Sequence, residues 1–202
     1  MDKMRWFGTL VAISAVSAFD AAADPVRYTA DRWHTRIYFD IDHMGLSNYG
    51  GRFTEFDIDF LFDEEDYSKS FVEVRVPVAS IDTFSPELNE KMPSVAFFDA
   101  ADHPVMHFRS TKIEQLDSSR ARMTGDLTIR GVTLPVIFDV TMNGKVLHPF
   151  YNLHNIGFSA TGSVDSRAYG VNRLPEWMLA SMVNVRIELE AFEGDSVPYY
   201  DE

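Results

Sequence analysis

The segment His34-Thr-Arg-Ile-Tyr-Phe-Asp-Ile-Asp-His43 alternates between apolar and polar side chains. On an extended chain, Ile37, Phe39 and Ile41 would share one face, and the polar residues between them would share the other. An amphipathic helix repeats every 3.6 residues, so a period of two disfavours a helix. The segment is therefore predicted to be a β-strand whose apolar face is buried and ends at His43.

The same alternation recurs along most of the chain. The runs are rich in β-branched and aromatic residues, as half-buried strands are. Further strands are expected at about residues 26–31, 56–62, 72–78, 104–114, 120–130, 136–142, 155–165 and 183–189. Because no helix pattern alternates with these runs, they predict an all-β fold of eight or nine strands, either an antiparallel barrel or a sandwich.

Turn-forming residues lie between the runs, where antiparallel hairpins require them. The expected turns are Tyr49-Gly-Gly51, Asp63-Glu-Glu-Asp66, Asp117-Ser-Ser119, Arg130-Gly131 and Asn143-Gly144. Asn-Gly is typical of a two-residue type I′ turn, so the last of these is the strongest hairpin signal.

The interior of such a barrel is the first candidate for a ligand site. A barrel of about eight strands either packs solid or holds one small ligand, and both alternatives stay open at this point. Gly125, Ala160 and Gly162 would leave volume between larger inward side chains. The residues predicted to line a cavity and bind its ligand are Ile37, Phe39, Ile41, His43, Phe56, Phe60, Phe108, Ile129, Phe138, Phe158, Val185 and Ile187.

Residues 84–104 break the strand rhythm. Ser85 followed by Pro86 is typical of a helix N-cap and first helical residue, which predicts a short helical insertion at about 85–100. The insertion carries the apolar side chains Leu88, Met92, Phe97 and Phe98. They would either form a lid over one mouth of the barrel or plug that end.

The first 23 residues have the order of a secretory signal peptide. A short basic start is followed by an apolar run from Trp6 to Phe19 and by the small residues Ala21–Ala23. A buried helix or an anchor is the alternative, but a spanning helix needs about 20 apolar residues and this run stops at Asp20. We expect cleavage after residue 23, one exported domain over residues 24–202, no membrane span, and a periplasmic location in a bacterium.

Composition excludes several classes of function. Thirty-one acidic against 18 basic residues give a net charge of −13, which disfavours nucleic acid and anionic membranes as main partners. The chain has no cysteine, so disulfides, thiol nucleophiles and thiolate metal sites are excluded.

No motif indicates catalysis. The six histidines lack metal-ligand spacing, and neither H-E-x-x-H nor G-x-S-x-G occurs. His34 and His43 are nine residues apart and would point to opposite faces of a strand, so structural roles are favoured for both. We predict no catalytic residue, no metal ligand and no cofactor.

Two arginine positions stand out in so acidic a chain. Arg130 precedes Gly131 at a turn, and Arg167 and Arg173 flank Tyr169-Gly170 in a loop. An arginine at a barrel mouth can contact a phosphate, and Arg167 is the candidate for such a head-group contact. The alternative is that each arginine fixes a turn by binding backbone carbonyls.

Several short motifs occur in a fixed order and spacing. They are Tyr28 with Asp31; His34-Thr35; Ile37-x-Phe39-x-Ile41-x-His43-x-Gly45; Gly51-x-Phe53-x-x-Phe56; Ile81-Asp82-Thr83; Phe97-Phe98-Asp99 with His103-Pro104; G-D-L-T-I-R-G-V-T-L-P from Gly125 to Pro135; Gly157 to Gly162; and Arg167-x-Tyr169-Gly170. Together they resemble the YceI-like family of periplasmic lipid-binding proteins, over nearly the whole chain after residue 27.

The resemblance implies an antiparallel lipocalin-like β-barrel, often dimeric, whose lumen holds a long isoprenoid or similar amphiphile. Two positions depart from the family pattern. Ala168 replaces an acidic residue, and Leu134 replaces a frequent Lys or Arg. If either position normally meets a charged head group, this chain would prefer a neutral one.

Three functions are weighed on this basis. The leading hypothesis is a non-catalytic protein that carries or stores a long apolar lipid. The second is a stress-related structural barrel that binds a partner and no lipid. The third is an enzyme that uses His43 at the barrel mouth.

Overall fold

A computed structural model describes residues 24–199, and the signal peptide expected at residues 1–23 lies outside them. The strands of the first half are β1 (Val26–Ala30), β2 (Arg36–His43), β3 (Ser47–Phe53), β4 (Asp57–Phe62), β5 (Phe71–Pro77) and β6 (Ile81–Asp82). Those of the second half are β7 (Val105–Gln115), β8 (Arg120–Ile129), β9 (Val132–Leu147), β10 (His154–Asp165) and β11 (Leu179–Glu193). The helices are the 3₁₀ turns η1 (Tyr67–Lys69) and η2 (Val78–Ser80) and the α-helix α1 (Pro86–Lys91).

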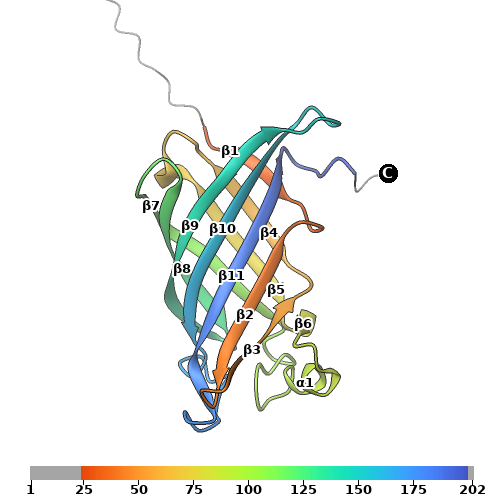
Figure 1. The fold of residues 1–202 in the computed structure, drawn as a ribbon, viewed down its shortest axis with the longest axis vertical. Helices are drawn as coiled ribbons and strands as arrows, with labels where there is room; N and C mark the ends of the chain where they lie inside the picture. Colours follow the sequence, from red (N-terminus) through yellow and green to blue (C-terminus); the bar gives the residue numbers. More distant parts are fainter. Residues whose placement is uncertain (1–23, 200–202) are drawn as a thin grey trace, which may run out of the picture.

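Eight strands form a closed antiparallel barrel. Their order is β1-β4-β5-β7-β8-β9-β10-β11, and β11 pairs with β1 to close the ring (Figure 1). The closing contact consists of three residue pairs, from Tyr28 with Glu193 to Ala30 with Ala191. β2, β3 and β6 continue the sheet from β11 below this contact. The predicted all-β barrel of about eight strands is confirmed, and the sandwich is excluded.

One side of the barrel is a long hairpin in which each strand is broken into two segments. In Figure 1, β1 and β2 descend as one strand of the hairpin, and β3 and β4 return as the other. Ala30 pairs with Ala191 and Arg36 with Glu188, so residues 31–35 face only two residues of β11. The five residues therefore bulge out of the sheet.

Thr35 restores the hydrogen bonds that the bulge interrupts. Its hydroxyl donates to the Glu190 carbonyl at 3.1 Å and accepts from the Glu190 N–H at 3.3 Å. The Asp31 N–H donates to the same carbonyl at 2.8 Å. Thr35 and Asp31 are both fully buried, so these groups cannot use water instead.

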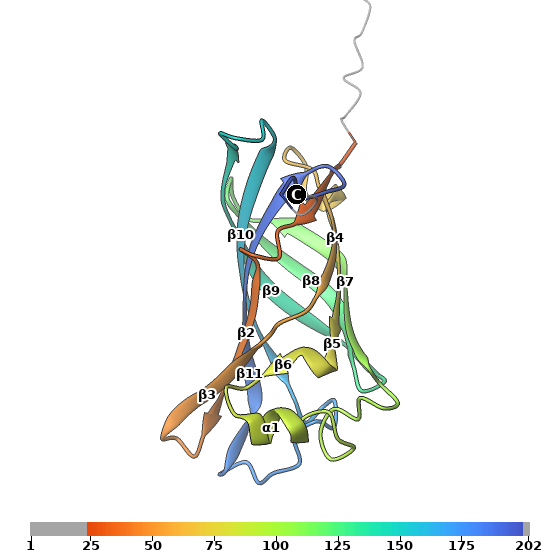
Figure 2. The same ribbon diagram turned by 90° about the vertical axis from the view of Figure 1, so that its right-hand side faces the viewer.

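The lower end of the barrel, where α1 and the β2–β3 turn lie, is completed by the insertion (Figure 2). β5 pairs with β4 and β7, and β6 takes the free edge of β3. The Thr54 N–H and hydroxyl both donate to the Ser80 carbonyl, at 2.9 and 3.0 Å, which joins η2 to the β3–β4 bend. Ser85 is the N-cap residue and Pro86 opens α1 as expected, but the helix ends at Lys91, well short of residue 100.

The expected turn at Tyr49–Gly51 is wrong, because these residues lie inside β3. The chain turns at residues 44–46 instead, where Met44 adopts a left-handed φ of 60°. The glycines serve close strand pairing rather than a turn: a Cβ on Gly50 would lie 2.3 Å from the Phe39 carbonyl oxygen.

The hairpin expected at Asn143-Gly144 is also wrong, because β9 runs straight through it. Gly144 pairs with Gly157 and Met142 with Phe158, so Asn143 is the extra residue of a β-bulge. The φ of Gly144 is 153°, which is not a type I′ value. The remaining expected turns are confirmed at Asp63–Asp66, Asp117–Ser119 and Arg130–Gly131.

Two apolar clusters hold the barrel. One cluster fills its upper end and consists of Tyr28, Phe60, Phe62, Tyr67, Ala121, Ile156, Phe158 and Ala191. The other runs along the wall below it and includes Ile37, Val76, Val78, Met106, Phe108, Met123, Ile129, Val136, Phe138, Ala160, Val164, Tyr169 and Val171. The upper cluster closes one end of the barrel with aromatic rings.

Replacing Thr35 by valine is expected to lower the free energy of unfolding by about 1–3 kcal/mol, because the buried Glu190 N–H loses its acceptor while side-chain volume is kept. Denaturant titration measures this. Thr35→Ser keeps the oxygen and should cost about 1 kcal/mol or less. Equal losses of stability in the two variants would show that the Thr35 hydroxyl does not stabilise the bulge through its hydrogen bonds to Glu190.

Candidate ligand-binding cavity

The barrel encloses a cavity of about 680 Å³. Every strand except β1 contributes side chains to its wall, together with α1 and the turns that follow it. Alternation along each strand explains the lining: on β5, for example, Val72, Val74 and Val76 all point inward. Among residues 24–199, no Lys, Arg, Asp or Glu side chain lies in the wall. The cavity therefore offers a long apolar surface without a fixed charge.

Eleven of the twelve predicted lining residues lie on this wall. They are Ile37, Phe39, Ile41, His43, Phe60, Phe108, Ile129, Phe138, Phe158, Val185 and Ile187. Phe56 does not, since it lies in the bend between β3 and β4, where strand alternation no longer sets the direction of a side chain. It lines a smaller outer pocket instead. That these residues bind a ligand stays a prediction.

Much of the wall consists of residues that were not predicted from the sequence. Additional lining residues include Tyr49, Phe53, Ile58, Phe62, Val72, Val74, Val76, Met106, Ile113, Met123, Leu127, Val140, Met142, Val164, Val183 and Leu189. Most of them share the alternation that identified the others, so extending that rule to all strands would have found them.

The two inward glycines do not create the cavity. A Cβ on Gly125 would lie 2.3 Å from the Phe108 ring, and one on Gly162 would lie 2.7 Å from the Phe138 ring. These rings occupy the space over the glycines and meet edge to face at 5.6 Å. The expectation that both glycines leave volume is therefore wrong, while Ala160 does line the cavity.

The insertion covers the lower end of the cavity. Leu88 on α1 and Met92, Phe97 and Phe98 after it all lie on the wall. Because the cavity persists beside them, they cover that end rather than fill it.

Most polar side chains in the wall are bonded within the protein. The Ser166 hydroxyl donates to the Ser181 carbonyl at 2.8 Å, and the Tyr49 hydroxyl donates to the Thr83 carbonyl at 2.7 Å. The Asn172 amide donates to the Ala180 carbonyl at 2.9 Å. The hydrogen-bond donors of these side chains are already used within the protein. The wall therefore offers a ligand few polar contacts.

The two ends of the cavity differ. At the upper end, Phe62 and Tyr67 are buried, and the Tyr67 hydroxyl donates to the Ser118 carbonyl at 3.0 Å. At the lower end, the lining residues His43 and Leu174 are exposed to solvent. The lower end is therefore the mouth.

The two arginines noted in the sequence fix loops at the lower end. The Arg130 guanidinium donates to the carbonyls of Phe97 and Gly170 and lies 3.7 Å from the Asp99 carboxylate. It thereby joins the insertion to the loop after β10.

Arg167 fixes the loop between β10 and β11 in the same way. Its guanidinium donates to the carbonyls of Leu174 and Leu179 and lies 3.1 Å from the Glu176 carboxylate. Arg167 is not among the residues that line the cavity, and a contact between it and a head group stays a prediction.

Comparison with known proteins gives the family. The YceI-like domain matches residues 28–191. The chain belongs to the YceI-like family. The resemblance noted in the sequence is thus confirmed.

Relatives and solved structures agree with this assignment. A UPF0312 protein of Pectobacterium atrosepticum is 33% identical over 167 residues, which is 81% of this chain and 86% of that protein. The YCEI protein of Campylobacter jejuni has a TM-score of 0.70 at 27% identity, covering 76% of this chain and 90% of that one. A polyisoprenoid binding domain from Saccharophagus degradans has a TM-score of 0.58 at 11% identity, covering 84% and 99%, which shows a shared fold.

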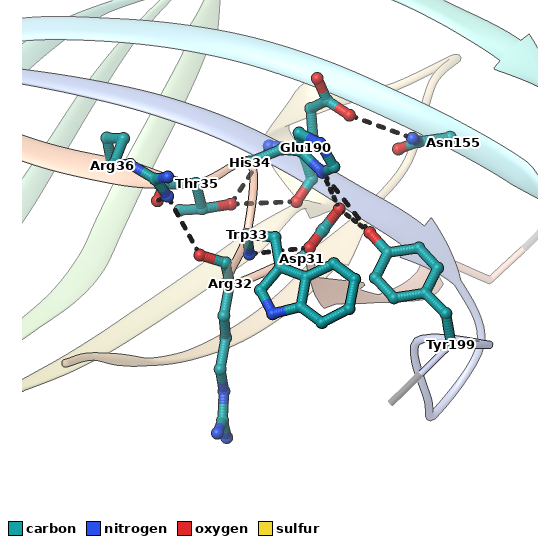
Figure 3. Close-up of polar contacts among 9 residues, drawn as sticks. All are labelled: Asp31, Arg32, Trp33, His34, Thr35, Arg36, Asn155, Glu190 and Tyr199. Atoms are coloured by element: carbon teal, nitrogen blue, oxygen red, sulfur yellow. Dashed lines mark hydrogen bonds and ion pairs between the residues drawn. The ribbon is translucent and has the colours of Figure 1, made fainter. Parts of the chain in front are cut away.

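In this YceI-like protein, a polar cluster outside the cavity lies beside the bulge of residues 31–35 (Figure 3). The Trp33 N–H donates to the Asp31 carboxylate at 2.9 Å, and the His34 ring and the Tyr199 hydroxyl both bond the other carboxylate oxygen. Trp33 also stacks on Tyr199, with ring centroids 4.7 Å apart. The cluster ties the bulge to the segment that follows β11.

The same cluster contains the ligand types of a metal site. Ligand atoms of Asp31, His34 and Glu190 lie within 4.8 Å of one another. The Asp31 carboxylate is already engaged by three groups, and the Glu190 carboxylate accepts from the Asn155 amide at 3.2 Å. The three side chains thus belong to one hydrogen-bond network, and the structural role of His34 stays a prediction.

The hydrogen bond to Asp31 raises the pKa of His34, more than partial burial lowers it. A raised pKa means that the folded state favours the imidazolium. The resulting stability is present below the ordinary histidine pKa of about 6.5 and is lost as pH rises through the raised value.

The difference in unfolding free energy between wild type and His34→Gln is therefore expected to be larger at about pH 5.5 than at about pH 9. Denaturant titrations at both pH values measure it. In an Asp31→Asn background, the larger difference at the lower pH should disappear, because the hydrogen bond that contributes most to the raised pKa is lost. If the effect of His34→Gln in the wild-type background were the same at both pH values, the proposed pairing of His34 with Asp31 would be contradicted.

Proposed function

We propose that the protein is a non-catalytic carrier or store for one long apolar chain of isoprenoid type. The observation that carries the proposal is the apolar cavity of about 680 Å³, closed at one end by aromatic rings and open at the other. Its size lies within the range of about 300–1,000 Å³ typical of small-molecule sites. A barrel that served only as a structural scaffold would gain nothing from this unfilled interior.

Burial of the chain itself supplies the affinity. Each methylene removed from water contributes about 0.8 kcal/mol, so a chain of some tens of carbons binds tightly without a specific polar contact. The same physics favours tolerance among chains of similar length. The neighbour from Saccharophagus degradans is described as a polyisoprenoid binding domain, which makes an isoprenoid the first ligand to test.

The polar end of the ligand is proposed to be neutral and to lie at the mouth. In the described part of the chain, no Lys, Arg, Asp or Glu of the wall would compensate an ionic group, and such a group would be costly to bury. His43 and Ser47, at the mouth, are the nearest polar lining residues. Leu134 is not part of the wall, so the uncharged wall itself is the basis for this preference.

An enzyme at His43 has less support. His43 pairs with Leu179 and Ser47 at the end of β2, and Ile41 and Tyr49 are the nearby lining residues. These neighbours include no carboxylate that would orient its ring.

Export to the periplasm and assembly as a homodimer are parts of the same proposal. The sequence of the first 23 residues supports export. Within residues 24–199, no helix has the length and hydropathy that a membrane crossing requires.

Blocking the cavity tests the proposal. Ala160 on β10 lines the cavity, whereas its neighbour Thr161 is exposed on the outer face. Ala160→Phe is expected to reduce loading of a polyprenol of about 40 carbons at least tenfold, because a ring would take the place of the chain. Native mass spectrometry after incubation with the polyprenol measures the bound fraction.

Thr161→Phe is the matched control and should load like wild type. Circular dichroism of both variants checks that the barrel is intact. Full loading of a folded Ala160→Phe variant, or no loading of wild type, would show that the cavity is not the binding site.

A further inference from the structure

An apolar rim surrounds part of the mouth. It consists of Met44 and Leu46 on the β2–β3 turn and of Leu174 and Trp177 on the β10–β11 loop. Leu46 is 79% exposed and Trp177 is 67% exposed, and with Met44 and Leu174 they form a patch rather than isolated apolar side chains. Exposed apolar groups gathered at one place mark a contact surface.

The two segments of the rim lie side by side and continue into the cavity. The Met44 N–H donates to the Met178 carbonyl at 3.1 Å, and the next residues toward the barrel, His43 and Leu179, pair with each other. His43, Leu174 and Leu179 also line the cavity. A ligand leaving the cavity at this side would therefore pass over the rim.

The rim is locally neutral in a strongly acidic protein. Residues 42–47 and 166–179 together carry two carboxylates, Asp42 and Glu176, and two arginines, Arg167 and Arg173, whereas the whole chain has a net charge of −13. Asp42 accepts from the Gly45 N–H at 2.9 Å, and Glu176 is held by Arg167. Both carboxylates of the rim thus have a partner within the protein.

We propose that the rim docks into the surface of a zwitterionic lipid bilayer when ligand is exchanged, a step that rests on the function proposed above. Moving a long apolar chain through water is strongly unfavourable, because each exposed methylene costs about 0.8 kcal/mol of transfer free energy. Contact of the mouth with the acyl region lets the chain pass between two apolar phases. Tryptophan and leucine are suited to that depth of the interface, and a neutral rim avoids repulsion or desolvation of charge.

The opposite end provides the control. Val146 and Phe150, beside the β9–β10 turn, are also exposed, at 60% and 85%. That end of the barrel is closed by the buried rings of Phe62 and Tyr67, so apolar residues there do not lead to the cavity. Exposure alone would make both ends dock, whereas the proposal requires docking by the rim only.

Flotation with phosphatidylcholine vesicles tests the proposal, using the chain from residue 24 onward. Wild type is expected to float with the vesicles, and Leu46→Ser/Trp177→Ser is expected to reduce the bound fraction about tenfold or more. Val146→Ser/Phe150→Ser should float like wild type. In a Trp33→Phe background, Trp177 is the one tryptophan left in the chain from residue 24 onward. Its fluorescence emission should shift to the blue on vesicle binding.

Three results would overturn the proposal: wild type that does not float, a rim variant that floats like wild type, or loss of flotation in the control variant. If wild type does not float and the rim variant converts a dimer to a monomer in analytical ultracentrifugation, the rim is a contact with a second copy instead.

The outcome is separable from that of the proposed function, because Leu46 and Trp177 are not part of the cavity wall. Polyprenol bound by wild type without flotation would reject the rim alone. Flotation without bound polyprenol would reject the carrier function alone.

Discussion

Closure of the sheet between β1 and β11 is the constraint on which the rest of the structure depends. Only three residue pairs make that contact, and the bulge immediately below it would leave buried backbone groups without partners. Thr35 and Asp31 supply the missing bonds to Glu190, and the cluster around the Asp31 carboxylate holds the bulge against the end of the chain. With the ring closed, every second side chain of each strand points to a common interior, which is why the wall of the cavity is continuous.

The bulge also explains the asymmetry of the barrel. Above it, β1 and β4 complete the ring, and aromatic side chains fill that end. Below it, β3 carries β6 on its free edge, and the insertion with α1 covers part of the lower end beside the mouth. Arg130 and Arg167 fix the loops there without entering the cavity. A closed apolar end, an uncharged wall and an exposed mouth together suit a chain-like ligand that enters from one side.

Strand alternation alone predicted the fold class, most strands and eleven lining residues, because the period of two is set by the backbone and is independent of tertiary contacts. Glycine positions were less predictable. Glycines can mark a turn, a bulge or a close approach, and only the partner strand decides: Gly50 meets a carbonyl, Gly144 lies at a bulge and Gly125 faces a ring. β3 was missed for this reason, and Phe56 was misplaced because the bend before β4 ends the alternation. The cluster of Asp31, His34 and Glu190 joins residues about 155 positions apart, which spacing along one chain cannot reveal.

The most direct test of the account is the identity of what the protein carries from its own cell. Protein purified from its native host without detergent can be extracted with organic solvent, and the extract analysed by mass spectrometry against a mock purification. The account predicts about one neutral, long-chain apolar molecule for each barrel. An extract with no such molecule, from protein whose lumen is then shown to be filled with ordered water, would contradict it.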